Sequence, residues 1–138
     1  MASGATLATL FSACGGASPT SPSGPASMLG VLAGRFTGSG VQVTVAGSAL
    51  GDVGGAVLVE STAGVFLLAR TNANAFSAVD AVCSHESCTI TGVDGAVYVC
   101  PCHGSRYSRS GQVLAGPAKA SLRQFAATFA DGVVTIAV

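Results

Sequence analysis

Two short segments of the chain each pair one cysteine with one histidine at a fixed spacing, Cys83-x-His85 and Cys100-x-x-His103. Four of the five cysteines and both histidines lie between residues 83 and 103, and such clustering indicates a metal or disulfide site. Each segment follows a short apolar run and is rich in turn-forming residues, which predicts a loop at the end of a strand. The fold must therefore bring two neighbouring loops together at one end of a β unit.

The sequence outside these two segments predicts an all-β domain. Val41, Val43 and Val45 alternate with polar residues, which is the period of a half-buried strand. Asp94-Gly95 and Asp131-Gly132 have the composition of hairpin turns, and no segment keeps a helical period. We expect a small antiparallel sandwich or barrel. The other expected strands are residues 56–60, 65–70, 96–99, 122–129 and 133–138.

The first 34 residues differ in composition from the rest of the chain. They contain no charged residue, and residues 15–27 consist of Gly, Ala, Ser, Pro and Thr, which cannot form a packed core. We predict a leader and a flexible Gly/Ser/Pro-rich tether over residues 1–34, followed by one domain over residues 35–138. The apolar part of the leader is too short for a membrane span, and its length fits the hydrophobic region of a signal peptide.

Cys14 stands apart from the other cysteines and follows Leu10-Phe11-Ser12-Ala13. This pattern resembles a bacterial lipobox, in which a cysteine after small residues is lipidated and becomes the mature N-terminus. Cys14 is therefore a candidate lipidation site. The alternative is an incidental cysteine in the remnant of a signal peptide.

The two Cys/His segments together supply two thiolates and two imidazoles. A structural zinc site uses this donor set in tetrahedral geometry. A two-iron, two-sulfide cluster also takes four protein ligands. Imidazoles in place of two thiolates leave its oxidised form near neutral, so that it accepts an electron more readily. The ligand types alone do not separate these two possibilities.

Two cysteines remain, Cys88 in the first segment and Cys102 in the second. A disulfide between them would tie the two loops together if their Cα atoms lie within about 7 Å. The alternative is a pair of reduced, buried cysteines. Export of the protein would favour the disulfide, because oxidising compartments preserve it.

The residues around the candidate ligands read Cys83-Ser84-His85-Glu86-Ser87-Cys88 and Cys100-Pro101-Cys102-His103-Gly104-Ser105-Arg106-Tyr107. They resemble the Rieske [2Fe–2S] family in its variant with a disulfide between the loops. That variant occurs in the Rieske subunits of cytochrome bc-type complexes and in related exported bacterial proteins. The resemblance covers roughly residues 38–138, and Gly116-Pro117-Ala118 is similar to the proline-containing loop that covers the cluster.

The resemblance implies one [2Fe–2S] cluster with a ligand set split between its two irons. Cys83 and Cys100 would bind the buried iron, and His85 and His103 would bind the outer iron near the surface. The family fold is a small antiparallel β domain in which two loops form the cluster-binding part.

Ser105 and Tyr107 match family positions whose hydroxyls hydrogen-bond a bridging sulfide and a ligand thiolate, respectively. Such bonds stabilise the extra negative charge of the reduced cluster. The resemblance therefore implies a potential at the high end of the Rieske range, on the order of +150 to +300 mV at neutral pH. The alternative is an ordinary turn serine and an ordinary core tyrosine.

The resemblance further implies one-electron transfer by a carrier that is not an enzyme on its own. Two roles are open, the Rieske subunit of a quinol:cytochrome c oxidoreductase and a stand-alone exported carrier for another respiratory oxidoreductase. Glu86 stands where quinol-docking members have an apolar residue, which favours the second role, although a solvated glutamate without a role is the alternative. From a different class, a structural zinc-binding β module for protein interactions is the competing interpretation.

The expected partners are redox proteins, namely cytochrome c, a cytochrome b with its quinol, or another respiratory oxidoreductase. Charged residues make up 9 % of the chain and its formal net charge is zero, so the sequence offers no basic face for nucleic acid. The expected location is the bacterial periplasm or the outer face of the cytoplasmic membrane. Membrane contact would come only through an N-terminal anchor at Cys14.

Overall fold

The computed structural model describes residues 26–85 and 87–138. Most of the expected leader and tether, the candidate lipidation site Cys14 and the acidic residue Glu86 therefore lie outside the described residues. Within the described ranges, no helix is long and apolar enough to cross a bilayer.

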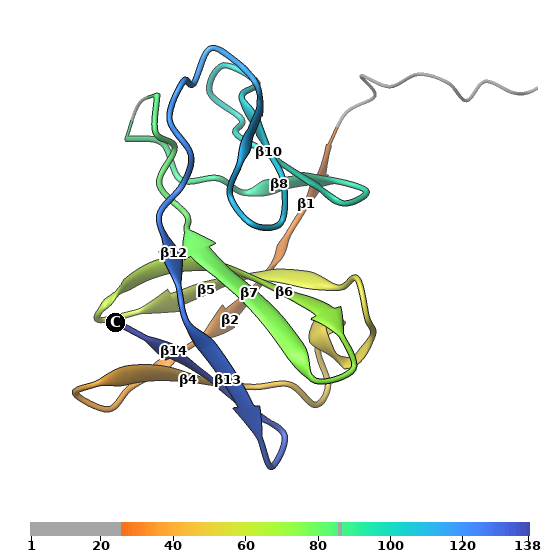
Figure 1. The fold of residues 1–138 in the computed structure, drawn as a ribbon, viewed down its shortest axis with the longest axis vertical. Coiled ribbons are helices and arrows are strands. Elements are labelled where there is room, and N and C mark those ends of the chain that lie inside the picture. Colours follow the sequence, from red (N-terminus) through yellow and green to blue (C-terminus); the bar gives the residue numbers. More distant parts are fainter. Residues whose placement is uncertain (1–25, 86) are drawn as a thin grey trace, which may run out of the picture.

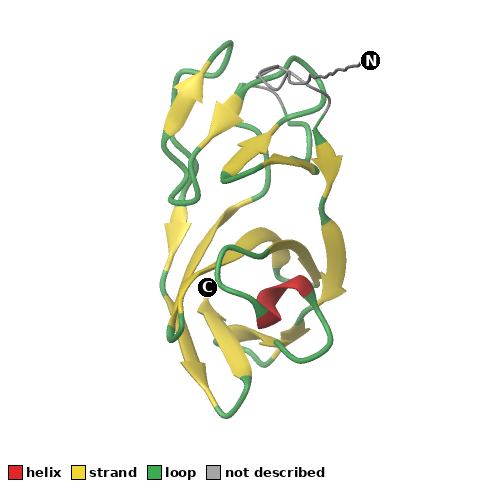
Figure 2. Ribbon diagram, turned by 90° about the vertical axis from the view of Figure 1, so that its right-hand side faces the viewer, coloured by secondary structure: helices red, strands yellow, loops and turns green. Residues whose placement is uncertain are grey.

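The described chain forms three β-sheets arranged one above another (Figures 1 and 2). We call them the loop sheet, which carries the two Cys/His loops, the middle sheet and the outer sheet. The only helical turn in the described ranges is the short 3-10 turn η2 (Ala49–Gly51), which buries Leu50. The prediction of an all-β fold is confirmed.

The middle sheet is buried on both faces, and its sequence explains why. Val57, Leu58 and Val59 are consecutive residues of one strand, and all three are buried. Because side chains alternate across a strand, Leu58 joins the core below the loop sheet, whereas Val57 and Val59 join the core against the outer sheet. A continuous apolar run is typical of a strand covered on both faces. The strand order is β12 (Gln124–Phe125), β7 (Ala75–Asp80), β6 (Gly64–Asn72), β5 (Ala56–Ser61) and β2 (Gly30–Ala33).

The outer sheet is covered on one face only, and its sequence alternates accordingly. Val41 and Val43 point into the core shared with the middle sheet, whereas Gln42 and Thr44 are exposed. This confirms the strand expected from the valine pattern, and Asp131-Gly132 turns the expected hairpin. The strand order is β13 (Ala127–Ala130), β14 (Val133–Ala137), β4 (Gly40–Thr44) and β3 (Arg35–Phe36).

The loop sheet is built from short strands that frame the two Cys/His loops. The first loop leaves the middle sheet after β7 and leads into the loop sheet, and the second loop joins two strands of the loop sheet (Figure 1). The two loops are therefore neighbours at one end of the molecule, as the sequence predicts. The strand order is β1 (Ser27–Met28), β8 (Gly92–Asp94), β9 (Val97–Val99), β10 (Arg106–Tyr107) and β11 (Val113–Ala115).

Residues 122–129 differ from the single strand that the sequence predicts. β12 pairs with β7 in the middle sheet, whereas β13 pairs with β14 in the outer sheet. Ala126 lies at the corner between them, and its carbonyl accepts a hydrogen bond from the N–H of Ala137. Phe125, Ala127 and Phe129 all pack against the same core. The alternation of inward and outward side chains therefore continues across the corner, and the sequence pattern does not reveal the change of sheet.

Residues 27–33 also differ from the expectation, which placed them in the tether. β1 pairs with β8 of the loop sheet, and β2 runs parallel to β5 at the edge of the middle sheet. Leu29 lies between β1 and β2, is buried, and donates its N–H to the carbonyl of Thr91 at 2.9 Å. These partners are distant in the sequence, and local composition does not reveal them.

Candidate metal centre

Each Cys/His loop is closed at its root by a backbone hydrogen bond from its first cysteine. The N–H of Cys83 donates to the carbonyl of Cys88 at 2.7 Å, and the N–H of Cys100 donates to the carbonyl of Ser105 at 2.8 Å. The two bonds enclose the same number of residues. Gly104 has a φ of 79°, a backbone conformation that favours glycine, and it lets the second loop turn back. Each of these hydrogen bonds fixes the first cysteine of its loop in the core.

The four predicted ligands lie at two levels of the loop pair. Cys83 and Cys100 are 4 % and 1 % exposed and belong to the core beneath the loops. His85 and His103 are exposed, and their ring centroids lie 5.2 Å apart with an interplanar angle of 81°. The structure thus brings together two buried thiols and, separately, two exposed imidazoles.

Cys88 and Cys102 form a disulfide, which confirms that prediction. Their Cα atoms lie 6.5 Å apart, and the bridge joins the first loop to the second. The sulfur atoms of Cys88, Cys100 and Cys102 all lie within 4.8 Å of one another. The bridge therefore runs directly beside one candidate ligand, while Cys83 and Cys100 keep their thiols.

The surroundings of Cys100 act on its thiol in two directions. Burial raises the pKa of the Cys100 thiol, and contact with the Cys83 thiol raises it further. The backbone N–H groups of Cys102 and His103 hydrogen-bond the sulfur and lower the same pKa. The site thus disfavours a bare thiolate in the core, yet it supplies two N–H donors to a thiolate that a metal has neutralised.

Tyr107 supplies a hydroxyl to the other buried cysteine. Its oxygen lies 3.2 Å from the sulfur of Cys83, and its side chain is fully buried. Burial raises the pKa of the Tyr107 hydroxyl, and the Cys83 thiol adds to this rise, whereas hydrogen bonds with Ser84 lower it. Tyr107 is therefore a neutral phenol at neutral pH, and it can donate to a Cys83 thiolate.

Ser105 is fully buried and links the second loop to a third one. Its hydroxyl oxygen accepts a hydrogen bond from the N–H of Ala118 at 3.0 Å, which leaves the hydroxyl proton available to another acceptor. Ala118 follows Gly116-Pro117, whose peptide bond is cis. The proline-containing segment thus lies against the second Cys/His loop.

Ser84 is a site residue that the sequence analysis did not single out. Its hydroxyl lies 3.1 Å from the hydroxyl of Tyr107 and donates to the carbonyl of Ala120 at 2.5 Å. It therefore ties the first loop to the third. Its place between Cys83 and His85 is the one signal in the sequence that could have drawn attention to it.

The donor set fits a two-iron cluster with mixed ligands. Buried thiols suit an iron inside the protein, and exposed imidazoles suit a second iron near the surface. The donors around Cys83 and Cys100 suit thiolate ligands whose charge grows on reduction. A structural zinc site gathers its four ligands around one metal in a closed tetrahedron. The split of burial between thiols and imidazoles favours two metal atoms.

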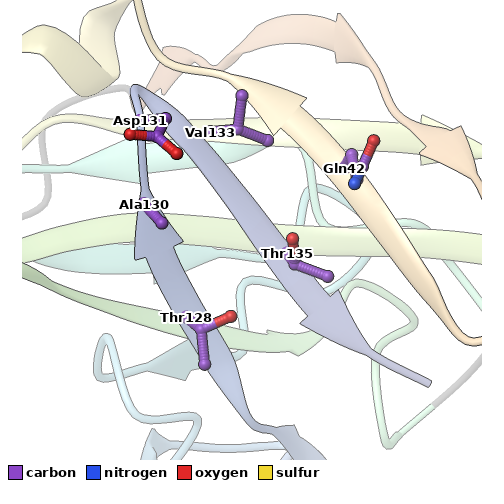
Figure 3. Close-up of a pocket in the computed structure, with 6 residues that line it drawn as sticks. All are labelled: Gln42, Thr128, Ala130, Asp131, Val133 and Thr135. Carbon is purple, nitrogen blue, oxygen red and sulfur yellow. The ribbon is translucent and has the colours of Figure 1, made fainter.

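A surface hollow of about 310 Å³ on the outer sheet is not this site (Figure 3). It contains no cysteine or histidine, and it lies on the sheet farthest from the two loops. Thr128, Thr135 and Gln42 are cross-strand neighbours there and form part of a polar outer face. The lining residues are Gln42, Thr128, Ala130, Asp131, Val133 and Thr135.

The fold and the site together define a class of protein, a small β domain that holds a metal cluster between two disulfide-linked loops. The Rieske [2Fe-2S] domain family matches residues 38–126, and the chain belongs to this family. The domain that defines this family is one that holds a [2Fe–2S] cluster. The family match gives the structural zinc module no support.

The curated relatives are similar to the chain around the cluster loops. The cytochrome b6-f complex iron-sulfur subunit of Chlorobaculum thiosulfatiphilum is 43 % identical over 54 residues, which are 38 % of this chain and 30 % of that protein. The subunit of the same name from Prochlorococcus marinus (strain MIT 9211) is 47 % identical over 45 residues, which are 32 % of this chain and 25 % of that protein. The similarity thus covers about a quarter to a third of these relatives.

Two solved structures share the fold over more of their length. The plasma membrane Rieske protein PetC3 from Synechocystis PCC 6803 has a TM-score of 0.54 at 26 % identity, and the match covers 60 % of this chain and 86 % of that one. A chain in the complex of reduced oxygenase and oxidized ferredoxin in carbazole 1,9a-dioxygenase has a TM-score of 0.54 at 25 % identity. That match covers 70 % of this chain and 92 % of that one.

Proposed function

We propose that Cys83, His85, Cys100 and His103 hold the Rieske cluster and that the protein is a high-potential carrier of single electrons. The observation that carries this proposal is the two-level arrangement of buried thiols and exposed imidazoles. When bound, the cluster takes up and releases one electron at a time. The two cysteines would hold the inner iron, and the two histidines would hold the outer iron, where redox partners approach.

Tyr107 and Ser105 would raise the potential of this centre. The Tyr107 hydroxyl is neutral and lies against the sulfur of Cys83, so it can donate to the thiolate. The Ser105 oxygen already accepts from Ala118, and its own proton can turn toward a sulfide. Both bonds strengthen as negative charge accumulates, which supports a potential on the order of +150 to +300 mV.

The disulfide between Cys88 and Cys102 would keep the two ligand loops at a fixed spacing during electron transfer. The third loop adds hydrogen bonds to both cluster loops, through Ser84 and Ser105. A site that is held from three sides changes little in shape when its charge changes. Small rearrangement favours fast exchange of electrons with a partner.

We place the protein in the bacterial periplasm or on the outer face of the cytoplasmic membrane, as a stand-alone carrier. A disulfide persists in oxidising compartments, and the similar PetC3 is a plasma membrane Rieske protein. Lipidation at Cys14 would anchor it, and cytochrome c or a respiratory oxidoreductase would be its redox partner. The second role, a subunit of a quinol:cytochrome c oxidoreductase, has its support in the cytochrome b6-f subunits among the relatives.

The ligand set is tested by metal analysis and potentiometry of the purified protein. We expect two irons and two sulfides per chain and a reversible one-electron wave at positive potential. The variants Cys83→Ser and His103→Ala should lose the cluster, whereas Cys14→Ser should keep it as the matched control. Bound zinc without colour would overturn the proposal, and a wave far below zero would remove its high-potential part.

The location is tested by fractionation of cells that express the full chain. Lipidation predicts that the protein stays with the membrane fraction and that Cys14→Ser releases it, with the cluster intact in both. Equal release of both forms would remove the lipid anchor. Reduction of cytochrome c by the reduced protein, compared with turnover of a quinol in a membrane complex, separates the two roles.

A further inference from the structure

Arg109 is a half-buried cation between the middle sheet and the loop sheet. It lies in the loop between β10 and β11, and its Nη2 donates to the carbonyls of Gly54 at 3.2 Å and Gly95 at 2.8 Å. Its guanidinium carbon lies 4.8 Å from the ring centroid of Tyr98. The backbone carbonyl of Arg109 accepts a hydrogen bond from Ser77 of the middle sheet at 2.7 Å. The cation is thus held in one place by both sheets.

The charge of Arg109 is not neutralised by a carboxylate among residues 26–85 and 87–138. Arg106, three residues earlier, differs in this respect, because it forms an ion pair with Asp94 at 3.0 Å. The Nη1 atom of Arg109 is also buried and has no hydrogen-bond partner in the described part of the chain. A fixed cation without a counter-ion, whose Nη1 side is buried, is screened less by solvent and salt than a fully exposed one.

Tyr98 connects Arg109 to the buried side of the metal centre. Tyr98 is fully buried and lies two residues before Cys100, so both side chains leave the strand on the same face, ~7 Å apart along the chain. Tyr107 pairs with Tyr98 across β9 and β10, and its hydroxyl reaches the sulfur of Cys83. Tyr98, Tyr107 and both cysteines belong to one core. The cation therefore lies against the core that also contains the two candidate thiolates, whereas the two histidines are exposed.

We propose that Arg109 is a tuning residue that raises the reduction potential of the cluster from its buried side. Uptake of one electron adds one negative charge to the centre, and a fixed cation against the core that contains the thiolates stabilises that charge. The effect acts through space and does not require a bond to a ligand. This inference rests on the proposed ligand set, because Cys83 and Cys100 place the inner iron next to Tyr98.

A purely mechanical role for Arg109 makes a different prediction, because its hydrogen bonds also join two sheets. The variant Arg109→Gln removes the charge, whereas Arg109→Lys keeps the charge but loses the paired bonds to Gly54 and Gly95. The double variant Arg106→Gln, Asp94→Asn is the matched control, since it removes an ion pair and leaves the net charge unchanged. Potential and melting temperature should be measured for each holoprotein.

We expect Arg109→Gln to lower the equilibrium constant for reduction at least threefold, which is roughly 30 mV for a one-electron couple. Arg109→Lys should stay within about twofold of the wild type, or roughly 20 mV, and the Arg106→Gln, Asp94→Asn double variant should do the same. The proposal is overturned if Arg109→Gln keeps the wild-type potential, or if Arg109→Lys falls as far as Arg109→Gln. A wild-type protein without a redox wave would instead overturn the proposed function.

A second variant tests the same charge without removing Arg109. Ala96 is exposed and lines the same surface hollow as Arg109. Ala96→Asp would place a carboxylate beside the guanidinium and should lower the potential as Arg109→Gln does, with the hydrogen bonds of Arg109 retained. Ala130→Asp on the outer sheet adds the same charge far from the cluster and should leave the potential unchanged. Equal potentials for these two variants would contradict the proposal.

Discussion

Leu67 and Leu68 are neighbours in β6, are both fully buried, and point into two different cores. Leu68 packs between the middle and outer sheets, where the fully buried side chains are all hydrocarbon. Leu67 packs below the loop sheet, where the core also contains Cys83, Cys100 and Tyr107. The core between the middle and outer sheets is held together by the burial of hydrocarbon side chains. The other has polar atoms that need partners, and a disulfide and hydrogen bonds supply part of its stability.

The variants Leu67→Ala and Leu68→Ala test the difference between the two cores and should have the largest effects. Each removes a fully buried leucine and should lower the free energy of unfolding by about 2–5 kcal/mol. Only Leu67→Ala should also speed the loss of the cluster, because its cavity opens in the core that contains the proposed ligands Cys83 and Cys100. Denaturant unfolding, with cluster absorbance followed in parallel, checks this. Equal cluster loss in both variants would mean that the two cores act as one.

Removal of the disulfide tests how far the loop sheet depends on covalent support. The double variant Cys88→Ala, Cys102→Ala opens a loop of sequence separation 14. It should lower the free energy of unfolding of the loop sheet by about 3 kcal/mol. We expect the cluster to be lost at a lower temperature, while the core between the middle and outer sheets melts close to its wild-type temperature. Thermal scans of the visible absorbance of the cluster and of the far-ultraviolet circular dichroism separate the two events. Coincident scans would contradict the distinction between the cores.

Ser105→Ala should affect both the stability and the potential. It leaves the N–H of Ala118 buried without its partner, at a cost of about 1–3 kcal/mol. The cluster should also become harder to reduce, because the proposed donor to its sulfide is lost. Thr135→Ala on the outer sheet is a control that should change neither quantity by much. A potential unmoved by Ser105→Ala would reduce Ser105 to a structural residue.

The smallest expected effect is that of Tyr107→Phe, which keeps the ring and removes one hydroxyl. The ring still fills the core, so the melting temperature should change little. Loss of the bond to Cys83 should destabilise the reduced form by about 1 kcal/mol relative to the oxidised form, which is roughly 40 mV. Potentiometry checks this, and an unchanged potential would show that the contact with Cys83 has no influence on reduction.

The sequence predicts the outer sheet and the ligand loops for two different physical reasons. Val41 and Val43 reveal their strand because one face of it is exposed, and alternation is a local property. The spacing of Cys83 with His85 and of Cys100 with His103 is restricted by coordination chemistry, so short motifs contain much of the site. The pairing of Cys88 with Cys102 follows once the other two cysteines are assigned as ligands.

Other features depend on contacts that no local pattern contains. The corner at Ala126 is hidden because Phe125 and Phe129 face one core from two sheets. The bonds of Arg109 to Gly54 and Gly95 join segments far apart in the sequence, so its place between the sheets appears only in three dimensions. The same holds for Ser84 and Ala120.

The segment that contains β1 and β2 has a mechanical consequence. β1 is bonded to the loop sheet and β2 lies parallel to β5 in the middle sheet, with Leu29 buried between them. Tension applied to the chain at Ala26 is therefore shared between two sheets. The hydrogen bonds between β2 and β5 would be loaded together in shear, so the load would reach the loop sheet and the middle sheet at the same time.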